Sequence, residues 1–176
     1  WYDSYFDMTT TGYQLWTVPA TSSYIIRCAG AGTANGLGII IETTVNLTQG
    51  EKIQILVGQQ GIRYQTGSSG GCGGSFVASG STPATGVVLV AAGGGGGTRN
   101  STLSGGVANA TTSTSGNTSS DGTGAGGSSG SGGSGSSSGW GGGGGGFTGN
   151  GTDSINLANT RGFSFVNGGL GGNTAT

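Results

Sequence analysis

Few side chains in this sequence are suited to acid–base, nucleophilic or metal chemistry. The chain has no His, five Lys and Arg residues, and six Asp and Glu residues among its 176. Asp3 and Asp7 share one face of a predicted strand but lie about 13 Å apart by strand rise, too far for a carboxylate pair. Asp121 or Asp153 could contribute to a calcium site, although neither lies in a ligand-dense loop. We therefore expect no catalytic residue, metal site or cofactor.

One glycine-rich loop has a superficial likeness to a dinucleotide-binding loop. Gly30, Gly32 and Gly36 follow a predicted strand, but their spacing is G-x-G-x-x-x-G and no helix is expected to follow. The few cations are too scattered to follow a phosphate backbone, which excludes nucleic-acid binding. No apolar run approaches the roughly 20 residues of a membrane span. We therefore expect neither nucleotide, nucleic acid nor membrane as a partner.

Two cysteines, Cys28 and Cys72, lie in different strand-like segments. In an oxidising compartment they would form one disulfide, worth roughly 3–4 kcal/mol of stability for a loop of this size. The alternative is a pair of buried free thiols. We expect the disulfide.

The sequence contains several acceptor motifs for N-linked glycans. Asn-x-Ser/Thr sequons occur at Asn46, Asn100, Asn109, Asn117 and Asn150. Glu42, Thr44 and Asn46 alternate along one predicted strand, so Asn46 should point to solvent. Covalent glycans would also explain how a chain with so few charges stays in solution. The sequons favour a secreted, extracellular glycoprotein.

Residues 1–97 have the pattern of a β-sandwich or jelly roll. Short β-branched and aromatic runs alternate with Gly, Pro, Ser and Thr, and the scarcity of helix-forming residues predicts essentially no α-helix. The spacing of the runs, about ten residues, is typical of such folds. The predicted strands span residues 1–8, 13–18, 24–30, 38–46, 52–57, 76–79 and 87–92.

Residues 98–160 differ in composition from the residues before them, because they are rich in Gly and Ser. The whole chain contains 45 Gly. Within it, glycines recur at every third position, at Gly124, Gly127, Gly130, Gly133, Gly139, Gly142 and Gly145. A second set of positions, also three residues apart, contains no Gly: Ala125, Ser128, Ser131, Ser134, Ser137 and Trp140. A three-residue period without Pro suits polyglycine II helices, which need lateral hydrogen bonds to neighbours. A flexible linker is the alternative.

The tract is too long to lie in one extended piece, so it should fold back at least once. Residues 70–74, 93–97, 141–146 and 168–172 are further candidates for the same packing. Residues 161–176 should contain a last strand, at 163–166, that returns to the sandwich. The chain would then be a single domain over residues 1–176, with the tract inserted into it.

Several segments resemble the extracellular glycine-rich domain of the anaplastic lymphoma kinase and leukocyte tyrosine kinase receptors. Residues 13–24 read YQLWTVPATSSY and residues 55–61 read ILVGQQG, the two most specific matches. Weaker matches follow in order, at residues 73–77, 89–96, 141–147 and 162–165, so the resemblance covers about residues 13–172. It implies a TNF-like β-sandwich carrying an inserted bundle of polyglycine II helices. It also implies either cytokine binding, as in the receptors, or a rigid structural or adhesive role.

The function expected from these observations is that of a non-enzymatic structural glycoprotein in an extracellular filament, coat or matrix. Low charge, ordered glycine packing and the expected glycans favour this role, in which the chain would self-associate into a homopolymer or oligomer. The aromatic residues Trp1, Tyr2, Tyr5 and Phe6 would then form a strand that pairs with a neighbouring subunit. A ligand-binding fragment of a receptor kinase-like protein and a carbohydrate-binding adhesin are the alternatives.

Overall fold

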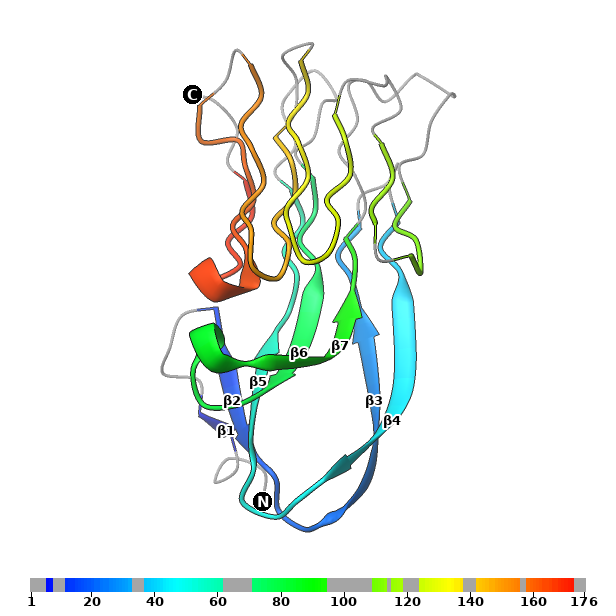
Figure 1. Ribbon diagram of the computed structural model, residues 1–176, viewed down its shortest axis with the longest axis vertical. Helices are drawn as coiled ribbons and strands as arrows, with labels where there is room; N and C mark the ends of the chain where they lie inside the picture. Colours follow the sequence, from blue (N-terminus) through cyan, green and yellow to red (C-terminus); the bar gives the residue numbers. More distant parts are fainter. Residues whose placement is uncertain are drawn as a thin grey trace.

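A computed structural model shows an all-β protein in which a β-sandwich carries a layer of glycine-rich segments (Figure 1). The structure describes residues 6–7, 12–32, 37–61, 71–94, 109–113, 115–118, 124–137, 142–155 and 158–172. Within these ranges there are strands and short 3-10 helices but no α-helix, as the composition predicts.

The strands form two antiparallel sheets that pack face to face. The larger sheet has the order β1-β2-β5-β6-β7, and the smaller one pairs β3 with β4. The bounds are β1 (Phe6–Asp7), β2 (Gln14–Thr17), β3 (Ser22–Ala29), β4 (Ile40–Leu47), β5 (Lys52–Leu56), β6 (Ser75–Ser79) and β7 (Val87–Ala92). Each strand predicted between residues 13 and 92 is therefore confirmed, within two residues at either end.

Alternation along the strands builds the core between the sheets. On β4, Glu42, Thr44 and Asn46 are exposed while Ile41 and Val45 turn inward. The inward side chains meet Ile53 and others from the larger sheet, because successive strand residues point to opposite faces. The fully buried members of this core are Val18, Cys28, Leu47, Ile53, Val77, Val90 and Ala92.

The larger sheet is buried on its second face as well. Leu56, Phe76 and Ala78 lie on the face away from β3 and β4, where they pack against Phe165. Two 3-10 helices, η2 (Pro83–Thr85) and η3 (Phe165–Asn167), approach each other over this face. The C-terminal region thus forms a partial third layer.

The return strand predicted at residues 163–166 is wrong, because the chain forms η3 there. Asn167 and Gly169 both donate backbone hydrogen bonds to the carbonyl of Ser164, at 3.0 and 2.9 Å. Gly168 has a φ of 95°, in the left-handed region, and reverses the chain. This turn directs Phe165, which is fully buried, into the core.

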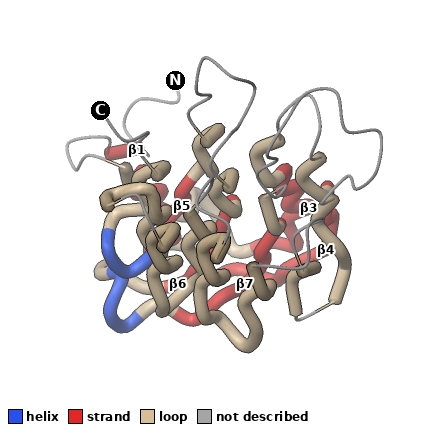
Figure 2. Tube along the Cα trace, turned by 90° about the horizontal axis from the view of Figure 1, so that it is seen from above, coloured by secondary structure: helices blue, strands red, loops and turns tan. Residues whose placement is uncertain are grey.

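The glycine-rich segments stand side by side beyond one end of the sandwich (Figures 1 and 2). We call residues 115–118, 124–137, 142–155 and 158–164 the glycine array. Viewed from above, these segments form several rows rather than one sheet (Figure 2). The chain reverses at Ser128–Ser131 and again where Gly146 donates to Gly149, at 2.9 and 2.8 Å. The expected folding back of the tract is confirmed.

Candidate functional site

The centre of the glycine array is the segment of consecutive glycines at residues 142–146. A Cβ added to Gly142 would lie 2.0 Å from the carbonyl oxygen of Thr160, and one on Gly145 would lie 2.0 Å from that of Phe163. Residues three apart therefore face the same neighbouring segment. Gly143 and Gly146, each one position further along, face a different segment. A Cβ added to them would lie 1.9 and 2.3 Å from the carbonyl oxygens of Gly133 and Gly130. This is the three-residue repeat predicted for polyglycine II packing.

The hydrogen bonds of the same segment also point in three directions. The carbonyl oxygens of Gly142, Gly143 and Gly144 accept from three separate parts of the chain. Their donors are the amides of Gly71, Gly162 and Gly133, at 3.4, 2.8 and 2.9 Å. A β-strand pairs in only two directions, within its sheet. The segment is therefore bonded on three sides, and an added Cβ would clash with backbone at Gly142, Gly143, Gly145 and Gly146.

Neighbouring segments close into rings of hydrogen bonds. Gly133 donates to Gly144 at 2.9 Å, and the adjacent Gly143 donates to Thr152 at 2.9 Å. Thr152 then donates back to Gly133 at 3.1 Å, which completes a triangle of three segments. Such lateral bonding satisfies backbone groups that an isolated extended glycine chain would leave to water.

The outward face of the array carries the register of small side chains. Ala125, Ser128, Ser131, Ser134 and Ser137 are all exposed. The expectation that this register points outward is confirmed for these five residues; Trp140 lies outside the described residues. The glycines that pack inward belong to both of the remaining sets of positions three apart. In addition to the predicted set, a Cβ added to Gly126, Gly132 or Gly135 would lie within 2.4 Å of a backbone carbonyl oxygen.

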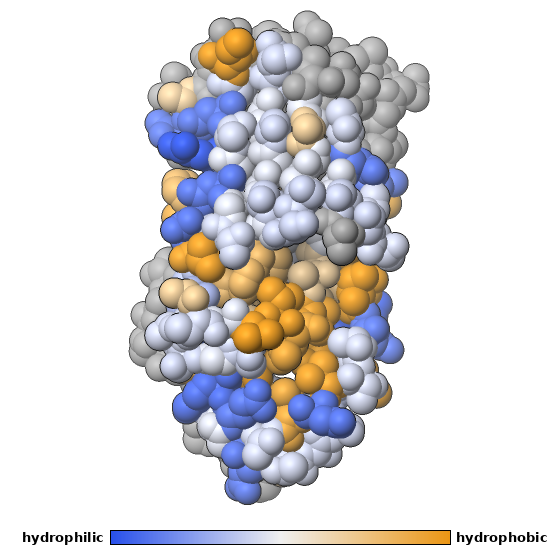
Figure 3. Space-filling model, in the orientation of Figure 1, coloured by the Kyte–Doolittle hydropathy of each residue, from blue (hydrophilic) through white to orange (hydrophobic). Residues whose placement is uncertain are grey.

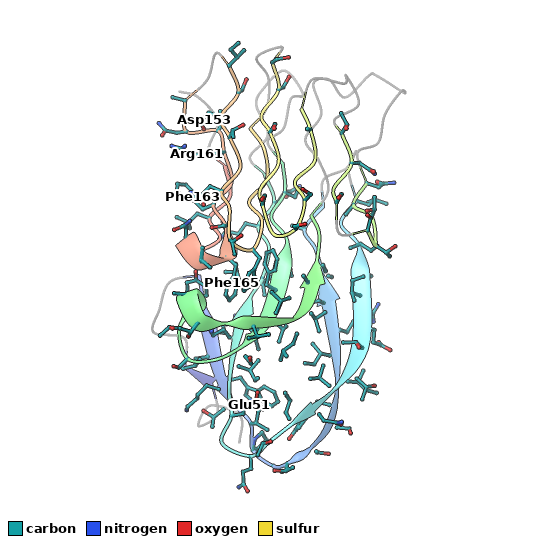
Figure 4. The ribbon with its side chains drawn as sticks, viewed as in Figure 1. Glu51, Asp153, Arg161, Phe163 and Phe165 are labelled. Atoms are coloured by element: carbon teal, nitrogen blue, oxygen red, sulfur yellow. The ribbon has the colours of Figure 1, made fainter. Side chains whose placement is uncertain are left out.

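An aromatic cluster joins the glycine array to the sandwich, which the sequence did not indicate. Phe147 stacks on Phe165 with ring centroids 4.7 Å apart, and Phe76 lies 5.8 Å from Phe165. Tyr13 meets Phe165 edge to face at 5.3 Å. Figure 4 shows Phe165 between the array and the sheet. These rings form the contact between the two layers.

A buried hydroxyl on β6 connects the two sheets of the sandwich. Ser75, 3 % exposed, donates to the carbonyl of Ala29 at 2.6 Å and accepts from the amide of Gly58 at 2.9 Å. The buried Gln54 donates to the carbonyl of Thr82 at 2.9 Å and so fixes the turn before β7. Both side chains have structural hydrogen-bond roles.

The described charges are dispersed and mostly serve local structure. Asp153 accepts from the Arg161 amide at 2.9 Å and lies 3.9 Å from its guanidinium, within the array (Figure 4). Glu51, at the opposite end of the molecule, accepts from the amide of Thr48 at 3.2 Å and closes the turn into β5. Among the described residues, no cluster of three or more His, Cys, Asp or Glu could hold a metal ion.

The disulfide predicted between Cys28 and Cys72 is wrong, because both cysteines are buried free thiols. Cys28 points from β3 into the core between the sheets. Cys72 lies in the glycine-rich segment before β6, where its thiol interacts with the backbone of Gly61. Burial raises the pKa of both thiols, and the Gly61 contact opposes this rise for Cys72.

The sequons fall in different environments. Asn46 is exposed on β4, as predicted, and its side chain accepts from the Ser23 hydroxyl. Asn109 and Asn117 are also exposed, but both side chains are hydrogen-bonded: Asn109 accepts from the amide of Leu37, and Asn117 donates to the carbonyl of Asn109, at 2.9 Å in both cases. Asn150 accepts from the amide of Ser164 at 2.8 Å and from Asn167, so its amide is part of the array. Asn100 lies outside the described residues.

The predicted N-terminal strand is described only at Phe6 and Asp7. These residues form β1 and pair with Trp16 and Leu15 of β2 in the same chain. Trp1, Tyr2 and Tyr5 lie outside the described residues. The pairing of this strand with a neighbouring subunit stays a prediction.

No protein-family model matches this chain, and no curated protein is similar to it in sequence. Across the described ranges, no helix has the length and apolar character needed to cross a membrane. The inference of function therefore depends on the geometry above.

Proposed function

We propose that this chain is a non-enzymatic, secreted structural glycoprotein, a subunit of an extracellular filament, coat or matrix. The observation that carries the proposal is the packing of residues 142–146, whose backbone is bonded to three neighbouring segments with no space for a Cβ. Such an array is ordered along its whole width, because each segment fixes the next. A rigid body of this kind suits a load-carrying spacer.

The distribution of polar groups supports a structural role. The buried polar side chains Gln54 and Ser75 hold turns and strand ends, and the Asp153–Arg161 pair lies within the array. These polar side chains thus help to hold the fold. A surface with so few charges needs another means of staying in solution or a partner that covers it.

Glycans at exposed sequons would supply that solubility. Asn46 is the best candidate, since it is exposed on the regular face of β3 and β4, one pair from the end of their ladder. Thr44 lies on the same face and outside the sequon, so that its substitution provides a control. The chain should be expressed in a secreting eukaryotic cell, with intact mass measured before and after enzymatic removal of N-glycans. Asn46→Gln should lose one glycan, whereas Thr44→Ala should lose none.

Assembly is tested on the purified chain by sedimentation velocity and electron microscopy. The proposal predicts oligomers that lengthen with concentration. Deletion of residues 1–8 should abolish them, since this segment is the predicted inter-subunit strand. Polymers of normal length from the shortened chain would contradict that part of the proposal.

A further inference from the structure

The larger sheet ends in two strands that each have one neighbour among the described strands. β1 pairs only with β2, and β7 pairs only with β6. The two strands lie at opposite ends of the same sheet, so their free edges face in different directions. Each free edge presents backbone groups that another strand can pair with.

Among the described strands, none pairs with the second edge of β7. At its glycine-rich end, the Gly93 carbonyl accepts from the amide of Ile39, at 3.1 Å, which closes the sandwich there. At its other end Val87 is 65 % exposed and Val88 39 % exposed. Figure 3 shows apolar side chains gathered near the middle of the molecule, where Figure 1 draws β7. At this end β7 therefore combines exposed apolar side chains with an edge to which no described strand is paired.

Edge strands of proteins that stay monomeric usually carry charges or Pro. β7 has the sequence VVLVAA and contains neither, and its pairing with β6 has an irregularity between Val77 and Ala78. The strands of the smaller sheet, by contrast, each carry one exposed charge, Arg27 on β3 and Glu42 on β4. Of these three strands, β7 is the one suited to receive a partner strand.

We infer that β7 pairs with β1 of a second copy of this chain, so that the larger sheets of successive subunits join end to end. The inference depends on the proposed structural function and names its interface. The segment around β1 contains Trp1, Tyr2, Tyr5 and Phe6. Aromatic residues pair well across strands with β-branched residues such as Val87 and Val88. Contact between opposite ends of one sheet is head to tail, and such contacts produce open filaments when they do not close into rings.

Two substitutions, made separately in the full chain, each disrupt one side of this interface. Val87→Lys places a charge on the receiving edge, and Ile25→Lys is its control, since Ile25 is also an exposed β-branched strand residue, at 73 %. Phe6→Pro removes a backbone donor from β1. Whichever way that donor points, β1 loses either its attachment to β2 or its pairing with the next copy. Circular dichroism and thermal unfolding establish that each variant is folded before assembly is compared.

Sedimentation velocity of the variants, alone and mixed, gives a decisive outcome. Val87→Lys and Phe6→Pro should each be monomeric, while Ile25→Lys should assemble as the unaltered chain does. An equimolar mixture of the two monomeric variants should form heterodimers that do not elongate, because only one intact interface remains. Unchanged polymers of Val87→Lys, or a mixture that stays monomeric, would overturn the inference but not the proposed function. A monomeric unaltered chain would overturn the proposed function itself.

Discussion

The hydroxyl of Tyr13 donates a hydrogen bond to the carbonyl of Phe165, 152 residues further along the chain. The same hydroxyl accepts from the amide of Gly168 at 2.8 Å. One side chain therefore joins the start of the sandwich to the turn that follows the glycine array. Since Phe165 is also the centre of the aromatic cluster, the two layers meet at this point.

Tyr13→Phe should destabilise the protein by about 1–3 kcal/mol, because the Phe165 carbonyl and the Gly168 amide each lose a partner. Urea unfolding followed by fluorescence measures the free energy of unfolding. Tyr24→Phe is the matched control. Its hydroxyl donates to the carbonyl of Ala20 at 2.6 Å at an exposed site, where water replaces it, so the cost should be smaller. Equal losses for the two variants would contradict the role assigned to Tyr13.

Gly143→Ala should prevent the array from packing, because the new Cβ would lie 1.9 Å from the carbonyl oxygen of Gly133. We expect a loss of at least about 3 kcal/mol, the upper range for overpacked sites. Gly93→Ala is the control, since among the described residues its Cβ would meet only Ala110, at 3.5 Å. It should change stability by less than about 0.5 kcal/mol. Comparable unfolding curves for the two variants would argue against lateral glycine packing.

Asp153→Asn and Asp153→Ala should differ, because Asp153 both accepts from the Arg161 amide and carries a charge. The Asn variant keeps an acceptor oxygen and loses the ion pair, which is partly exposed and worth less than about 1 kcal/mol. The Ala variant also loses the acceptor, which adds roughly another 1 kcal/mol. Thermal unfolding at low and high salt tests this. The difference between the unaltered chain and the Asn variant should shrink in high salt.

Thiol titration tests the environment of Cys28 and Cys72. A disulfide-exchange reagent should detect two thiols per chain after denaturation, and both should react slowly in the native protein because they are buried. Burial raises the pKa of both thiols above the ordinary value of 9.0, so the unfolded chain ionises first as the pH rises. Their contribution to stability is complete below about pH 9 and should decline above it. Absence of titratable thiol in the denatured chain would indicate a disulfide instead.

Local sequence patterns were sufficient to predict most of the strands and the outward register of the array. The strand β7 has the predicted bounds, and alternation placed Asn46 on the exposed face of β4. The period of three predicted that Ser131, Ser134 and Ser137 would face outward. These features follow from side-chain direction within one element, which sequence spacing determines.

Contacts between distant segments could not be predicted in this way. Residues 163–166 have the alternation of a strand, yet Phe165 turns into a 3-10 helix because the aromatic cluster and the Gly168 turn favour it. The pairing of Cys28 with Cys72 was inferred from the presence of two cysteines in an expected oxidising compartment, whereas their surroundings direct one thiol into the core and the other toward Gly61. The resemblance to the receptor domain implied a glycine bundle but not how Tyr13 anchors it.

Sedimentation velocity of the purified, secreted chain over a wide range of concentration tests the structural-subunit account most directly. The account predicts a concentration-dependent series of oligomers that continues into filaments visible by electron microscopy. A single monomeric species at every concentration, with the glycans intact, would contradict it.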